Sequence, residues 1–118
     1  MESCCCLLRE LMELVRRHGV ASEIVRCLGG AARSDLWLQM KADMLGTRVE
    51  RPMCTDAASL GAAMLAAVGT GDSDSIRAVS EAWYRPDKVF EPDAARTAAN
   101  QGVYERYLDA RKRLYKQE

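Results

Sequence analysis

The sequence has no excess charge of either sign and no long apolar run. Its 118 residues include 17 basic and 17 acidic side chains, so no overall field attracts nucleic acid or an anionic membrane surface. No stretch approaches the roughly 20 uninterrupted apolar residues of a membrane span, and the short run Cys4–Leu8 is followed at once by charge. We therefore expect no nucleic-acid partner and no membrane partner, and a cytoplasmic location.

Cysteines with metal-binding or redox spacing are also missing. Three of the five cysteines are contiguous, Cys4 to Cys6, and the others, Cys27 and Cys54, form no CxxC pair. An odd number in this arrangement favours neither a disulfide framework nor a zinc site. We expect reduced, mostly buried thiols that act as small apolar side chains.

The known phosphate-binding fingerprints are absent as well. The chain contains neither GxGxxG nor GxxxxGK[ST], which disfavours the Rossmann and P-loop classes of nucleotide protein. Asp35, Asp43 and Asp56 have no spacing that marks a catalytic site, and solvated or helix-capping roles are expected for them. No catalytic or metal-binding residue is predicted.

What the chain does have is the composition of a protein that folds as one domain, residues 1–118. Apolar residues make up 48% and charged residues 29%, far from the profile of a disordered chain. Apolar positions at helical spacing predict an amphipathic helix over 4–18, and the run 23–28 predicts a buried strand. Ser34 as N-cap and Gly46 as stop then bound a second helix.

The second half continues the alternation. Residues 47–51 predict a strand that Pro52 stops, and Thr55 is expected to cap a helix that runs to Gly69 and is apolar nearly all round, hence buried on most sides. A short helix capped by Asp74, an extended segment at Val89-Phe90 and a helix over 93–118 follow. The order predicts an α/β fold with few parallel strands and several packed helices, an excerpt from a larger domain.

One turn in this pattern is a candidate ligand site. The segment Gly29-Gly30-Ala31-Ala32-Arg33-Ser34 lies between a strand and a capped helix, where open α/β sheets bind ligands. Glycines let a ligand approach the backbone, and the helix N-terminus offers free amides to a phosphate. A nucleotide suits the turn, although a turn without a ligand fits the same pattern.

The longer stretch resembles a known family. Residues 28–46 are similar to the adenosine-side segment of FGGY carbohydrate kinases, the xylulokinases and glycerol kinases among them. Thr47–Pro52 and the LGAA helix around Ser59–Ala66 resemble the family's next strand and helix, and Phe90–Asp93 resembles the start of its C-terminal end. The likeness covers nearly the whole chain and is strongest from residue 24 to about 71.

The resemblance implies a partial actin-like, ribonuclease H-like ATPase fold, with ATP held between two α/β domains. Gly29, Gly30 and Ala31 would line the adenosine with their backbone, and Ser34 would lie near the adenine. Gln39 and Asp43 match the family's Q…AD pattern and would be polar supports of the site, whereas Trp37 would pack. Asp56 stands where relatives usually carry Glu.

The resemblance also implies what lies elsewhere. In the family, the carboxylate base, the groups around the β- and γ-phosphates and the metal ion belong to upstream segments. ATP, Mg²⁺ and the sugar are therefore expected only in a full-length, xylulokinase-like parent, and this chain alone is expected to be inactive with at most weak nucleotide affinity. The alternative is a non-enzymatic module that forms a homodimer through its strand edge or its apolar helix faces.

Overall fold

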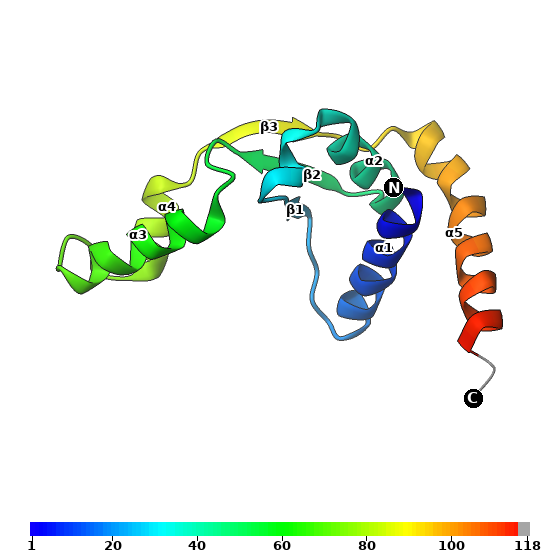
Figure 1. Cartoon of the computed structure of the whole chain (residues 1–118), viewed down its shortest axis with the longest axis horizontal. Helices are drawn as coiled ribbons and strands as arrows, with labels where there is room; N and C mark the ends of the chain where they lie inside the picture. Colours follow the sequence, from blue (N-terminus) through cyan, green and yellow to red (C-terminus); the bar gives the residue numbers. More distant parts are fainter. Residues whose placement is uncertain (116–118) are drawn as a thin grey trace.

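The computed structural model describes residues 1–115 and contains a small sheet with helices packed against it and a pair of helices that projects beyond it (Figure 1). The order of elements confirms the alternation expected from the sequence. In chain order they are α1 (Glu2–Arg17), β1 (Ile24–Arg26), the 3-10 helix η1 (Gly30–Arg33), α2 (Asp35–Leu45), β2 (Arg48–Pro52), α3 (Ala57–Gly69), α4 (Ile76–Trp83), β3 (Pro86–Phe90) and α5 (Ala94–Tyr115).

The sheet has β2 in the middle, parallel to β1 and antiparallel to β3. Val49 of β2 aligns with Val25 on one side and with Phe90 on the other. The parallel pair agrees with the prediction, but the full third strand differs from the short extended segment expected at Val89-Phe90. Only Phe90 of β3 is buried, so the strand has no apolar alternation by which the sequence could have revealed it.

Two apolar clusters lie on the two sides of α2. The first fills the space between α2 and the sheet, and in it Leu38 and Val49 are fully buried. The second joins α2 to α1 and α5, where Met44 packs with Cys5, Cys6 and Tyr104. Helix α2 is therefore the central layer, held by the sheet on one face and by two helices on the other.

The thiols divide as expected between the interior and the surface. Cys5, Cys6 and Cys27 are buried, and Cys4 and Cys54 are exposed. Burial raises the pKa of the Cys5 and Cys6 thiols, which keeps both protonated and apolar at neutral pH. These side chains therefore fill the core as small hydrophobic groups.

Helices α3 and α4 form an arm that projects beyond the sheet (Figure 1). None of the residues of α3 is buried, and Leu65 is 65% exposed. The expectation that this helix is buried on most sides is therefore wrong for the described chain, because α3 packs mainly against α4. The arm also explains a radius of gyration of 17.4 Å, against roughly 13 Å for a compact domain of this size.

The helix ends match the sequence at some positions and not at others. Ser34 caps α2 and left-handed Gly46 ends it, as predicted. The caps of α3 and α4 are each one residue later than predicted, at Asp56 and Ser75 instead of Thr55 and Asp74. Helix α5 is described to Tyr115, and its expected continuation over 116–118 lies outside the described residues.

Within residues 1–115, no helix combines the length and the apolar character that crossing a bilayer needs.

Candidate functional site

The turn between β1 and α2 depends on the backbone of Gly29. This residue has φ 81° and ψ −178°, a combination almost restricted to glycine. Its amide donates to the carbonyl of Thr55 at 2.7 Å, which joins the turn to the segment that follows β2. Gly29 therefore has a structural reason to be glycine, whatever the turn binds.

The outer surface of the turn is open. A Cβ atom added at Gly29 or Gly30 would meet no heavy atom within 4 Å. Ala31 and Ser34 are exposed beside them, whereas Ala32 is fully buried and anchors the inner side. The structure thus brings the four residues predicted to contact the nucleotide together on one solvent-facing turn.

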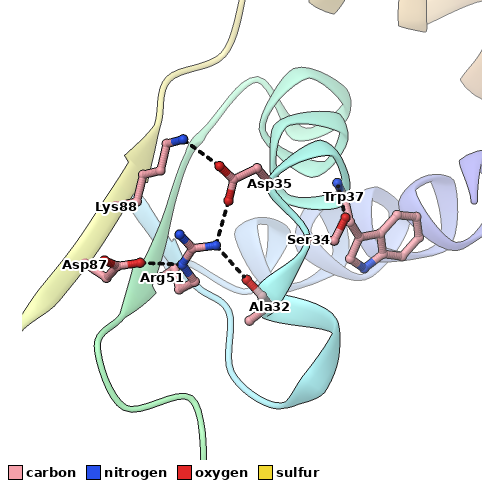
Figure 2. A network of polar contacts seen from close by, with 7 residues as sticks. All are labelled: Ala32, Ser34, Asp35, Trp37, Arg51, Asp87 and Lys88. Atoms are coloured by element: carbon pink, nitrogen blue, oxygen red, sulfur yellow. Dashed lines mark hydrogen bonds and ion pairs between the residues drawn. The ribbon is translucent and has the colours of Figure 1, made fainter.

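Ser34 has a defined role in this turn. Its hydroxyl oxygen accepts a hydrogen bond from the Trp37 amide at 3.3 Å and so caps α2 (Figure 2). The Trp37 ring is half-buried against the second cluster, with the Lys41 ammonium 5.2 Å from its centre. Trp37 packs against this cluster, as expected.

The carbonyl of Ala32 is held by Arg51, which reaches back to the turn from the end of β2. One guanidinium nitrogen, Nη1, donates to this carbonyl at 3.3 Å and to Asp35 at 2.7 Å, and Nε donates to Asp87 at 2.6 Å (Figure 2). The Arg51 side chain is only 16% exposed. The network connects η1, the first turn of α2, β2 and β3.

The charges of this network reinforce one another. Lys88 also donates to Asp35, at 2.6 Å, and Lys88 and Arg51 together hold the pKa of the Asp35 carboxyl below its usual value. Hydrogen bonds to Asp87 and Asp35 raise the pKa of Arg51. Sequence reasoning missed this network, because it exists only when β3 returns antiparallel and aligns Lys88 with Arg51.

An open hollow of about 440 Å³ lies next to the turn. Its walls come from η1 and from the chain at and after the end of β2, and β3 contributes one carboxylate. The lining residues are Arg33, Arg51, Pro52, Met53, Thr55 and Asp87. The hollow therefore combines the exposed edge of the turn with two guanidinium groups.

Gln39 and Asp43 lie away from the turn and support a different junction. The Gln39 amide donates to Asp43 and to the carbonyl of Glu91, both at 2.9 Å. Asp43 also accepts from the Asp93 amide and from Arg96. They are polar supports, as expected, but of the connection from β3 to α5. Asp56 caps α3 through the amide and hydroxyl of Ser59.

The chain is a mixed α/β unit whose parallel strand β1 leads through an open turn into the capped helix α2. The family model for the C-terminal domain of the FGGY family of carbohydrate kinases matches residues 1–70, which include the turn. The chain belongs to this family.

Two curated relatives show how much of such a protein the chain represents. It is 36% identical over 115 residues to a xylulose kinase of Bacillus subtilis (strain 168), covering 98% of this chain and 22% of the relative. It is 35% identical over 115 residues to a glycerol kinase of Ectopseudomonas mendocina (strain ymp), covering 97% and 23%. The chain spans about a fifth of the length of the curated relatives it matches.

A solved structure shows the same fold. The crystal structure of a xylulose kinase from Rhodospirillum rubrum superimposes with a TM-score of 0.78 at 24% identity, over 97% of this chain and 23% of that one. A second, of ligand-bound xylulose kinase from Lactobacillus acidophilus, gives 0.71 at 22% identity over 78% and 19%. The expected partial actin-like fold is confirmed.

Proposed function

We propose that this chain forms the adenosine-binding wall of the ATP cleft of a carbohydrate kinase. The parent enzyme would transfer a phosphoryl group from ATP to a sugar hydroxyl and would be most like a xylulose kinase. The observation that carries the proposal is the turn at Gly29-Gly30, whose backbone is open to a ligand at the N-terminal end of α2. Membership of the kinase family supports it.

The described residues fit the adenosine of a bound nucleotide better than they fit its Mg²⁺ ion. Open backbone at Gly29, Gly30 and Ala31 suits the flat face and ribose of an adenosine. For Mg²⁺, the described residues include no group of three or more histidine, cysteine, aspartate or glutamate side chains placed to hold a metal ion. The proposal therefore assigns adenosine to this chain and assigns Mg²⁺, the sugar and the catalytic base to the remainder of the parent.

Because the catalytic base and the metal are assigned to the rest of the parent, we propose that the isolated chain has no kinase activity. Phosphoryl transfer requires positioned groups around the β- and γ-phosphates, whereas Asp56 caps α3, Asp43 holds the start of α5 and Asp35 pairs with Arg51. A cytoplasmic location remains part of the proposal, since ATP-dependent sugar phosphorylation needs the cytoplasmic ATP pool.

A titration of the isotope-labelled chain with ATP, followed through its amide NMR signals, tests the binding claim. We expect shifts at Gly29 to Ser34 at millimolar ATP, and no shifts at Gly69 or Gly71 in the distant arm. Tripolyphosphate is the matched control, because it carries the phosphate charge without adenosine. Unchanged signals at the turn, or equal shifts with tripolyphosphate, would contradict an adenosine wall.

A second candidate function, a self-associating module without catalysis, is favoured by the exposed arm. Helix α3 contains no charged residue and leaves Leu65 exposed. In a two-fold contact each residue meets the same patch on the other copy, so a charged patch would repel itself and an uncharged one does not. Sedimentation over a range of concentrations separates the two functions, since a clean monomer argues against self-association.

A further inference from the structure

Arg51 makes a side-chain contact that ties the candidate nucleotide turn to the sheet. Its guanidinium reaches the carbonyl of Ala32 inside the turn, and its position is set from two sides by Asp35 and Asp87. The lengths of 2.6 and 2.7 Å to these carboxylates, with the low exposure of the side chain, describe a group fixed in one place.

Other contacts also hold the turn, since Ala32 is fully buried in the first apolar cluster. Among its backbone hydrogen bonds, the Ala32 amide donates to Gly29, the Ser34 amide donates to Ala31 at 3.4 Å, and the Leu38 amide donates to Ser34. These bonds lie within the turn or lead into α2, whereas the bond from the Gly29 amide to Thr55 attaches the turn to the segment after β2. Arg51 supplies an attachment to β2 and, through Asp87, to β3.

Charge gives Arg51 a second effect. The network contains two carboxylates, Asp35 and Asp87, and two cations, Arg51 and Lys88, so it is neutral as a whole. Removing the guanidinium would leave a net negative charge beside the hollow that adjoins the turn. Such a charge would disfavour an anionic ligand in the hollow, whereas a lysine at this position would preserve the neutral balance.

We propose that Arg51 is a positioning residue of the nucleotide site, which acts through Ala32 and Asp35 to hold the Gly29–Ser34 turn in its binding conformation. The predicted effect of Arg51 on ATP binding rests on the proposed function, whereas its predicted effect on the conformation of the turn does not. Lysine does not reproduce this arrangement, because its donors all sit on one nitrogen, whereas Arg51 donates from two separate nitrogens, Nε to Asp87 and Nη1 to Asp35 and Ala32.

The experiment compares Arg51→Lys with Arg77→Lys in the full 118-residue chain. Arg77 is an exposed residue of α4 that pairs with Glu81 on the same helix, so it controls for an arginine-to-lysine change elsewhere. In nucleotide-free protein, Arg51→Lys is expected to speed amide hydrogen exchange at Gly29, Ala32 and Ser34 by about tenfold. Exchange at the core residues Leu38 and Val49 should stay at the wild-type rate, and Arg77→Lys should change neither group.

The binding measurement uses ATP as the probe. Arg51→Lys is expected to weaken ATP binding at least about fivefold, and Arg77→Lys to leave it unchanged. If the wild-type chain binds no ATP, the proposed function fails, while the exchange measurement still decides the role of Arg51. If exchange at the turn is unaffected by Arg51→Lys, the positioning role is overturned even when ATP binds.

A second variant keeps the test decisive if Arg51→Lys does not fold. Asp87→Asn removes the charged acceptor of Arg51 Nε and leaves Ala32 and Asp35 intact. It is expected to speed exchange at the same turn amides by a smaller factor, about threefold. Equally faster exchange throughout the core would show that Arg51 acts on overall stability. An unchanged exchange rate at the turn would overturn the positioning role.

Discussion

The carboxylate of Asp43 on α2 lies 2.7 Å from the Nε atom of Arg96 on α5. Its other oxygen accepts the Asp93 amide at 2.8 Å, one residue before α5 begins. The Asp43 side chain is 5% exposed, whereas that of Arg96 is 60% exposed. A buried carboxylate on the central helix thus fixes the start of the C-terminal helix.

Asp43→Asn should therefore lower the free energy of unfolding by about 2 kcal/mol, because it weakens charge-assisted hydrogen bonds to a buried group. Arg96→Gln is the matched control and should cost less than about 1 kcal/mol, since its side chain faces solvent. Urea unfolding of both variants measures the difference. Equal losses would mean that the exposed partner carries the interaction.

The two glycines of the turn should respond differently to alanine. Gly29→Ala is expected to cost about 1–3 kcal/mol, because alanine is strained at φ 81°. Gly30→Ala should change stability by less than about 0.5 kcal/mol, since its φ is ordinary and the added methyl meets nothing. Yet Gly30→Ala should weaken ATP binding, if the nucleotide approaches this backbone. Thermal unfolding of both variants measures the backbone strain, and ATP titration of both measures the contact with the nucleotide.

Ser34 offers a test of capping against ligand contact. Ser34→Ala removes the acceptor of the Trp37 amide and should cost about 1 kcal/mol of stability. Ser34→Asn keeps a side-chain acceptor and should recover most of that loss. Chemical denaturation of the three proteins checks this, and a Ser34→Asn variant as unstable as Ser34→Ala would rule out the cap as the main role.

Tyr104 gives a prediction for alkaline pH. Burial, followed by its hydrogen bond to Glu13, raises the pKa of Tyr104 to about 12 from an ordinary value of 10.0. A raised folded-state pKa means that this contribution to stability is complete below pH 10.0 and is lost as pH rises through about 12. The difference in tyrosinate absorbance between wild type and Tyr104→Phe should show that late titration. A midpoint near 10.0 would place this hydroxyl in solvent.

The arm should govern any self-association. Leu65→Glu places a carboxylate on the uncharged surface of α3, where it would face its own copy across a two-fold contact. We expect the apparent mass of the wild type to rise with concentration and that of the variant to stay monomeric in sedimentation. Leu114→Glu, at a similarly exposed site on α5, is the control. If both variants behave like the wild type, neither surface mediates association.

Local chemistry in the sequence predicted much of the fold. Ser34 and Gly46 marked the two ends of α2, because capping and left-handed conformations depend on single residue types. The turn at Gly29 was recognised in the same way. These features need no knowledge of the distant chain.

The missed features all depend on distant partners. β3 forms because its backbone pairs with β2, and only Phe90 records that contact in burial. The Arg51 network then follows from that register and not from any motif. For α3, the sequence shows an apolar helix but not what would cover it, so its exposure could not be inferred.

The arm begins and ends at one place on the sheet. Pro52 pairs with Pro86, and the Met53 amide donates to the carbonyl of Arg85 at 2.9 Å. The two ends of residues 53–85 are therefore hydrogen-bonded to each other next to the sheet. Topologically the arm is an enlarged hairpin loop, and the entropy of closing such a loop changes only slowly with its length. Insertions and deletions within it can therefore accumulate during evolution without shifting the register of β2 and β3. The pairing that places Lys88 beside Arg51 therefore does not depend on the length of the arm.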